Sequence, residues 1–63
     1  MIKVISFVEK MLFDFEKIAI YDKDDNLLFS GYKKDFLGKN ILQNYFVTTF
    51  WLHNDRLYIS ANQ

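Results

Sequence analysis

The sequence predicts a small α+β domain in the order helix, β-hairpin, short helix, β-hairpin (αββαββ). The first observation behind this prediction is an Asp/Asn-rich turn at residues 22–26, which lies between apolar runs at 18–21 and 27–32. The second is a similar unit at residues 45–61, centred on Asn54-Asp55. The third is the helical spacing of apolar residues before the first hairpin. We therefore expect a four-stranded antiparallel sheet with helices over one face.

The chain of 63 residues is expected to form one domain, residues 1–63. A domain of this size buries only about 60% of its unfolded surface, so its core needs reinforcement. The sequence has no cysteine for a disulfide or a thiolate metal site, whereas aromatic residues make up 19% of it. Aromatic packing or self-association is therefore the expected source of stability.

Charge and hydropathy argue against some classes of function. A formal net charge of zero disfavours a broad contact with nucleic-acid phosphates. No apolar run approaches the roughly 18–20 residues that span a bilayer, and the first residues lack the small-residue cleavage site of a signal peptide. We expect a cytoplasmic protein with no membrane partner.

A helix is predicted over residues 2–13, because polar and apolar positions recur every three to four residues. The polar positions are Lys3, Ser6, Lys10, Asp14 and Lys17, and the apolar stripe is Ile5, Val8, Leu12 and Phe15. Phe7 and Phe13 widen this stripe, which indicates that the helix packs on a sheet. A strand over residues 2–8 is the alternative, because several residues there are β-branched.

The first hairpin has a predicted register. A turn at Asp24-Asp25 pairs Asp22 with Leu27, Tyr21 with Leu28, Ile20 with Phe29 and Ala19 with Ser30. Side chains alternate between the two faces of a strand. One face then carries Ile18, Ile20, Leu27 and Phe29, and the other carries Ala19, Tyr21, Leu28, Ser30 and Tyr32.

A short helix is predicted next. Asp35 is a suitable N-cap residue, and we expect one or two helical turns after it, with Phe36 or Leu37 and Ile41 pointing inward. Asn40 or Asn44 ends this helix in the prediction.

The second hairpin has its turn at Asn54-Asp55. This turn pairs His53 with Arg56, Leu52 with Leu57, Trp51 with Tyr58, Phe50 with Ile59 and Thr49 with Ser60. Phe50, Leu52, Leu57 and Ile59 fall on one face, and Val47, Thr49, Trp51, Tyr58 and Ser60 fall on the other. The apolar and mixed sets separate cleanly, which supports the register.

Both hairpins therefore have one aliphatic and Phe-rich face and one face with Tyr and Trp. We expect the helices to cover the first face, so that Phe50 packs in the core against Ile59 and Phe29. The second face stays open and carries Tyr21, Tyr32, Trp51 and Tyr58. The alternative is that the N-terminal helix covers this second face instead.

The segments IAIYDKDDNLLFSGY, DFLGKNIL and VTTFWLHNDRLYI give the chain a resemblance to a group of proteins. With these segments, residues 17–60 resemble small uncharacterised proteins of Gram-positive phages and prophages. Those proteins show a strand, an Asp/Asn-Gly turn, an LL(F/Y)xG segment, a short helix and a closing NDxLxI hairpin. The resemblance implies an accessory or host-interaction role in the host cytoplasm, in the class that includes anti-CRISPR and other anti-defence inhibitors. It implies no catalytic residue.

Motifs for metal binding and catalysis are incomplete. Asp22, Asp24 and Asn26 match positions 1, 3 and 5 of a calcium loop, but Leu27 and Lys33 replace the required Gly and Glu. His53 is the single histidine, and no Cys or Ser motif accompanies it as a nucleophile. We therefore expect no catalytic residue, no metal site and no cofactor.

The open face is the predicted binding surface. Tyr and Trp are enriched in protein-binding hot spots, so Tyr21, Tyr32, Trp51 and Tyr58, with Lys33 and Lys34 beside them, form the candidate site. We expect a non-enzymatic module that binds a host or phage protein or forms a homodimer. The alternative is a single-stranded nucleic-acid binder that uses the same rings and the Lys33, Lys34 and Lys39 cluster. The competing explanation of the rings is cross-strand pairing that only stabilises the sheet.

Overall fold

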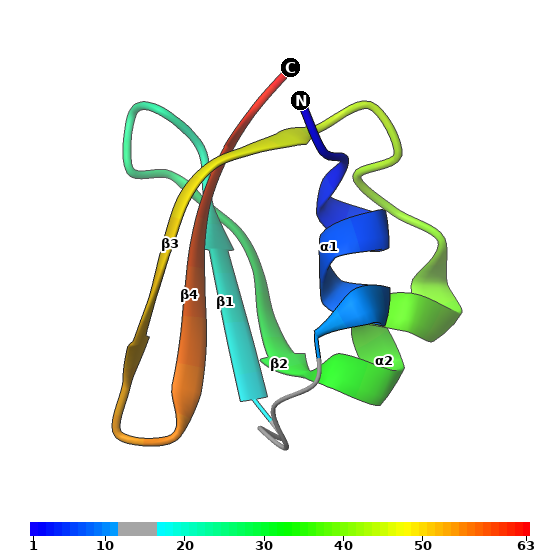
Figure 1. Cartoon of the computed structure of the whole chain (residues 1–63), viewed down its shortest axis with the longest axis vertical. Helices are drawn as coiled ribbons and strands as arrows, with labels where there is room; N and C mark the ends of the chain where they lie inside the picture. Colours follow the sequence, from blue (N-terminus) through cyan, green and yellow to red (C-terminus); the bar gives the residue numbers. More distant parts are fainter. Residues whose placement is uncertain (12–16) are drawn as a thin grey trace.

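A computed structural model describes residues 1–11 and 17–63 of the chain. Within them lie two helices and four strands in the predicted αββαββ order (Figure 1). The elements are α1 (Val4–Lys10), β1 (Lys17–Tyr21), β2 (Leu27–Tyr32), α2 (Lys33–Lys39), β3 (Phe46–His53) and β4 (Arg56–Asn62). The predicted α+β class is confirmed.

The four strands form one sheet in the order β2-β1-β4-β3. The sheet is mixed and not purely antiparallel as predicted, because β1 and β4 run parallel at its centre. The cause is the connection between the hairpins. After β2, the chain passes through α2 and returns along the helical layer, so that β3 starts at the end of the sheet where the first hairpin turns (Figure 1).

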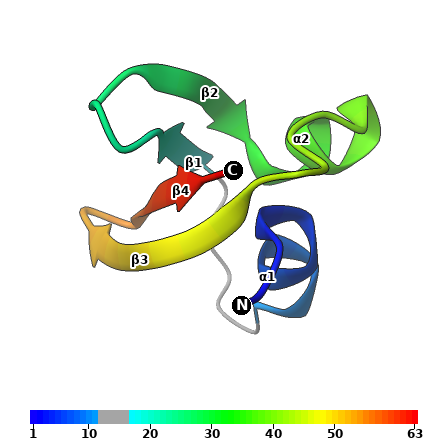
Figure 2. The same ribbon diagram turned by 90° about the horizontal axis from the view of Figure 1, so that it is seen from above.

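Both helices lie on the same face of the sheet, as the view from above shows (Figure 2). The buried core lies between these two layers, and its members among the described residues are Val4, Val8, Ile18, Ile20, Phe36, Leu57, Ile59 and Ala61. The helices therefore cover the face that carries Ile18, Ile20 and Ile59, as predicted. The alternative, in which the N-terminal helix covers the Tyr and Trp face, is wrong.

The helix α1 is shorter than predicted. The helix begins at Val4 and not at Ile2, because the residues before it pair with β3. Lys3 bridges to Phe46, and the Val47 N–H donates to the Ile2 carbonyl at 2.9 Å. The helix ends at Lys10, and residues 12 and 13 of the predicted helix lie outside the described residues, as do Leu12 and Phe15 of the predicted stripe. The strand alternative is wrong.

The helix α2 begins earlier than predicted. Tyr32 is its N-cap residue, and Asp35 lies in the first turn, where a carboxylate interacts favourably with the positive end of the helix. Phe36 is its buried residue and lies 5.2 Å from the ring of Phe29, centroid to centroid. Asn40 ends the helix in a left-handed conformation, as one of the two predicted stops.

The second hairpin has the predicted register at all five pairs, from Thr49 with Ser60 to His53 with Arg56. The predicted place of Val47 on the open face is wrong, because a bulge between Val47 and Thr49 pairs Val47 with Ala61, and Val47 packs against the core. Asn54 and Asp55 both have positive φ, 49° and 61°, which is the conformation that a two-residue type I′ turn requires. Asn and Asp tolerate this conformation better than most residues. The turn residues and the alternation together therefore determine the register.

The first hairpin departs from its predicted register at one end. Ile20 faces Phe29 and Ala19 faces Ser30 as predicted, but a bulge after Ile20 places Tyr21 opposite Leu27 and not Leu28. Leu27 therefore moves away from the predicted core face and is exposed, whereas Leu28 packs against the core. The predicted pairing of Asp22 with Leu27 is wrong for the same reason.

Phe50 lies on the predicted face but not in the core. Its ring packs 4.8 Å from that of Phe7 on α1, yet 47% of the residue is exposed. The reason is the position of β3 at the edge of the sheet, where no further strand of the described chain covers its side chains.

Candidate functional site

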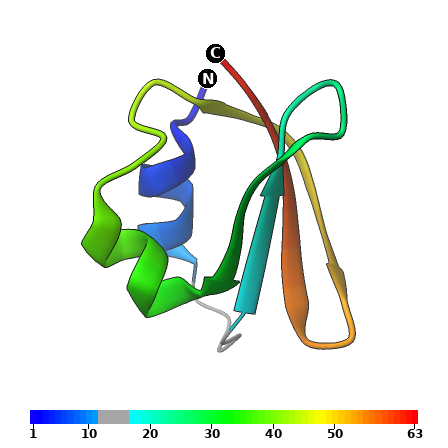
Figure 3. The same ribbon diagram turned by 180° about the vertical axis from the view of Figure 1, so that it is seen from behind.

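The face of the sheet opposite the helices is left uncovered by the helices of the described chain (Figure 3). Residues that pair across neighbouring strands share a face, so the register assigns three rows to this open face. The rows are His53, Arg56, Lys17 and Tyr32; Trp51, Tyr58, Ala19 and Ser30; and Thr49, Ser60, Tyr21 and Leu27. An apolar centre is thus flanked by a cationic row on one side and a hydroxyl-rich row on the other.

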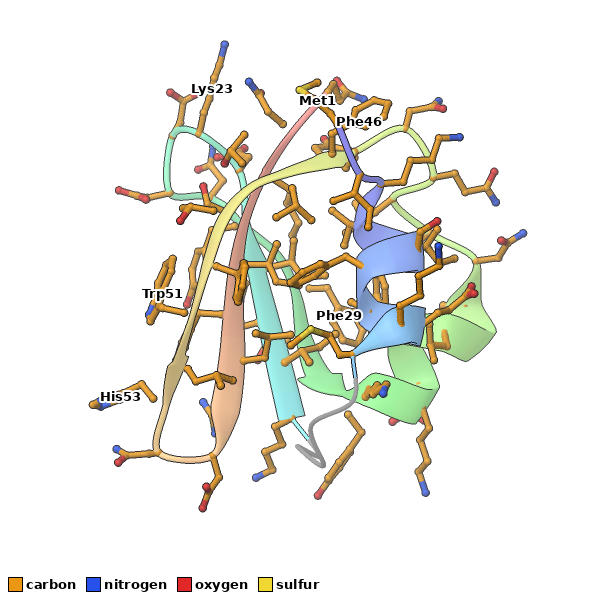
Figure 4. The ribbon with its side chains drawn as sticks, viewed as in Figure 1. Met1, Lys23, Phe29, Phe46, Trp51 and His53 are labelled. Carbon is orange, nitrogen blue, oxygen red and sulfur yellow. The ribbon has the colours of Figure 1, made fainter. Side chains whose placement is uncertain are left out.

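The central row is dominated by a stack of two rings, Trp51 on β3 and Tyr58 on β4. Their centroids are 5.5 Å apart and their planes differ by only 5°. Figure 4 shows Trp51 on the side of the sheet away from the helices, whereas Phe29 lies between the sheet and the helices. Trp51 remains 46% exposed although it is stacked. The stack therefore offers a flat apolar surface to a second molecule.

Beside this stack lies a hollow of about 350 Å³. It is lined by Tyr21, Asp25, Thr49, Trp51, Tyr58 and Ser60. Three of the four predicted aromatic residues therefore meet at one place. The hydroxyl groups of Thr49 and Ser60 and the carboxylate of Asp25 add polar groups to its wall, which suits a contact that combines ring packing with hydrogen bonds.

The remaining predicted residues lie elsewhere. Tyr32 is at the end of β2, on the opposite edge of the sheet from Trp51, with the Lys17 Nζ 5.7 Å from its ring centroid. Lys33 and Lys34 follow it in the first turn of α2. The Nζ of Lys39 lies 5.9 Å from the ring centroid of Phe29, a residue of the helix-covered face. The predicted basic cluster is thus on α2 and not beside the Trp51–Tyr58 stack.

Two cations of the open face were missed by sequence reasoning. Lys17 and Arg56 are neighbours in the parallel pairing of β1 with β4 and form the row next to the stack. A purely antiparallel sheet gave no reason to bring them together. Lys17 stands two residues before Ala19, and Arg56 stands two residues before Tyr58. Ala19 and Tyr58 also pair, so this equal spacing is the signal in the sequence.

The turn at residues 22–26 is closed by Asp22. Its Oδ1 accepts the backbone N–H groups of Asp24 and Asn26 at 2.8 and 2.9 Å, and its Oδ2 accepts the Asn26 side-chain amide at 3.1 Å. The hydrogen bonds from Asn26, backbone first and side chain second, lower the pKa of the Asp22 carboxyl. Both oxygens of this carboxylate are thus used within the turn.

His53 is exposed at the end of β3, next to the turn at Asn54-Asp55, and its Nε2 lies 3.1 Å from the side-chain Nδ2 of Asn54. Across residues 1–11 and 17–63, no group of three or more His, Asp or Glu side chains is placed to hold a metal ion. In the same residues, neither helix is long and apolar enough to cross a membrane.

No protein-family model, curated protein or solved structure matches this chain. The resemblance to phage proteins consequently stays a prediction, and the candidate site rests on the geometry of the open face.

Proposed function

We propose that this chain is a non-enzymatic protein-interaction module that binds another protein through the open face, with Trp51, Tyr58 and Tyr21 as its anchors. The observation that carries this proposal is the stacked Trp51–Tyr58 pair, with Trp51 half exposed, on the face without helices. Rings of these two types are the side chains most often found at the energetic centre of protein interfaces.

The packing of the core supports the proposal. In the described part of the chain, eight buried residues between sheet and helices form the core cluster without any contribution from Trp51 or Tyr58. A stacked pair stabilises a sheet by only about 0.5–1.5 kcal/mol beyond its burial, and a smaller or polar pair would fit the same register. A stacked pair with a half-exposed Trp51 at this place therefore suits a partner better than it suits the isolated fold.

The resemblance of residues 17–60 to phage proteins extends the proposal to the type of partner. It favours a protein of a bacterial host cell, bound in the cytoplasm, with an inhibitory effect of the anti-CRISPR or other anti-defence kind. The immobilised chain should then retain a discrete protein from a Gram-positive host lysate, identified by mass spectrometry.

The test compares variants on the two faces of the same strand pair. Tyr58→Ala removes half of the stack, and we expect a loss of about 2 kcal/mol or more, roughly thirtyfold in affinity for the captured protein. Leu52→Ala is the matched control, because Leu52 is 48% exposed on the helix side of β3, and retention is compared at a concentration at which the parent and both variants are monomeric. Equal retention by the parent and by folded Tyr58→Ala would refute the open face as the binding surface.

Single-stranded nucleic acid is the second candidate ligand. It is favoured by the row of Lys17 and Arg56 next to the stack, since such proteins place bases on aromatic rings beside cationic side chains. Two phosphate contacts predict that affinity for a labelled oligonucleotide falls roughly sevenfold between about 50 and 200 mM salt. A protein complex centred on the stack should change much less over the same range.

A further inference from the structure

The strand β3 has an open outer edge. Among the described residues, only those at the start of the strand have a partner on that side, where Lys3 bridges to Phe46 and the Val47 N–H reaches the Ile2 carbonyl. From residue 48 to 53, no other strand of the described chain lies beyond it. Its backbone groups there are available to a further strand.

This edge lacks the usual protection. Monomeric proteins shield edge strands with lysine, proline, inward-pointing charges or very short strands. Residues 48–53 contain no charged residue and no proline, and they include three consecutive large apolar residues, Phe50, Trp51 and Leu52. These three are 47, 46 and 48% exposed. The bulge between Val47 and Thr49 is the one protective feature in β3.

We propose that β3 pairs antiparallel with β3 of a second copy of this chain, which joins the two sheets into one continuous sheet of eight strands. This inference goes beyond the proposed function, because it uses the edge of the sheet and not its open face.

The sequence of β3 is complementary to itself in one register. In an antiparallel pair, directly opposite residues share a face. The two-fold axis that relates the two copies must therefore pass beside one residue of β3 and not between two consecutive residues. With the axis at Trp51, Phe50 faces Leu52 of the second copy, and Trp51 faces its equivalent. Thr49 then faces His53 of the second copy. Every apolar residue of this segment thus meets an apolar residue, and every polar one meets a polar one.

Neighbouring registers are less complementary. An axis at Phe50 places Trp51 opposite Thr49, and an axis at Leu52 places Trp51 opposite His53. The register at Trp51 also aligns the two open faces, so that the rings of Tyr58 and Trp51 from both copies form one row of four. Self-pairing therefore doubles the aromatic surface.

A second copy is favoured over a foreign strand by this self-complementarity and by the size of the chain. A domain of 63 residues without disulfides has a small core, and oligomerisation is a common way to reinforce such a core. The edge carries no charge that would repel an identical strand.

Sedimentation equilibrium of the parent chain and of two lysine variants tests the pairing. We expect the parent to form dimers and Leu52→Lys to raise the dissociation constant by about thirtyfold or more, because it places a charge within the paired edge. Leu27→Lys is the matched control. Leu27 is 56% exposed on β2, the opposite edge strand, and the control should still form dimers. Circular dichroism confirms that each variant is folded.

Disulfide trapping tests the register, and the chain has no native cysteine to interfere. In the proposed register, the Cα atoms of Thr49 in one copy and His53 in the other are about 4.5–5.5 Å apart, which is within the range for a disulfide. The double variant Thr49→Cys/His53→Cys should therefore form covalent dimers on mild oxidation. Each single variant should not, because identical positions lie about 13 Å apart along the strands.

The outcomes separate this inference from the proposed function. A parent that stays monomeric at millimolar concentration overturns the self-pairing, even if it binds a foreign strand. A dimer that Tyr58→Ala dissociates and Leu52→Lys leaves intact also overturns it, yet it supports the open face as a binding surface. A dimer lost in Leu52→Lys and trapped only by the double cysteine variant supports β3 pairing, whether or not the open face binds a partner.

Discussion

Asp22 shows how a single residue determines the shape of a turn. Its carboxylate accepts two backbone N–H groups and one side-chain amide across four residues. Such local bonds explain why Asp initiates turns so often. The partial match to a calcium loop in the sequence therefore corresponds to a carboxylate that already has its partners inside the turn.

The first prediction concerns calcium. Because both oxygens of Asp22 are engaged, and Leu27 and Lys33 stand at the positions of the missing loop residues, millimolar calcium should leave the melting temperature unchanged. Differential scanning calorimetry with and without EDTA checks this. A rise of several degrees that EDTA reverses would contradict it.

The second prediction concerns acid stability. The folded pKa of Asp22 lies below its ordinary value, so the unfolded chain binds the proton first as pH falls. The contribution of this carboxylate is fully present above about pH 4 and is lost as pH falls through the lowered folded pKa. Asp22→Ala should melt lower than the parent at pH 7, and the difference should shrink in acid. An unchanged difference at low pH would exclude a role for the ionised carboxylate.

At the scale of the elements, the position of a strand in the sheet decides how much a side chain contributes. Phe36 on α2 is fully buried, whereas Phe50 on the edge strand β3 is half exposed. The sequence places Phe50 on the helix side and offers Phe36 or Leu37 as an inward residue of the short helix. Such patterns indicate the face on which a side chain lies, but not how deeply it is buried. The expected core position of Phe50 failed because the order of the strands was unknown.

The third prediction compares these two rings. Phe36→Ala should cost about 3–5 kcal/mol, close to the whole stability of a domain of this length, roughly 3–9 kcal/mol. Phe50→Ala should cost about 1–2 kcal/mol, because the ring that it removes is only half buried and contacts the ring of Phe7. Urea unfolding at low protein concentration measures both. Equal losses would show that β3 is covered in solution.

The elements also show what local patterns can predict. The register of the second hairpin follows from Asn54-Asp55 and the alternation of apolar residues, and all predicted pairs are present. The bulge after Ile20 has no signature in the sequence, so Leu27 and Leu28 exchange their predicted roles. Local turn chemistry determines pairs near a turn, whereas a bulge depends on how the whole strand packs.

At the scale of the molecule, the path of the chain between the hairpins determines the site. The return through α2 makes β1 and β4 parallel neighbours, which brings Lys17 beside Arg56 and next to the Trp51–Tyr58 stack. Alternation predicted the rings of the open face correctly, because it depends only on local geometry. The cationic row could not be predicted, because it depends on which two strands meet at the centre.

The central claim is that the Trp51–Tyr58 stack serves a partner and not the fold. The most direct measurement is the free energy of unfolding of Trp51→Ala/Tyr58→Ala by urea, at a concentration where the chain is monomeric. The loss of one stacked cross-strand pair, together with the partial burial of its two rings, predicts a decrease of about 2–4 kcal/mol and an unchanged circular dichroism spectrum. A decrease of about 6 kcal/mol or more, as for two fully buried rings, would show that this face belongs to the core and would contradict the claim.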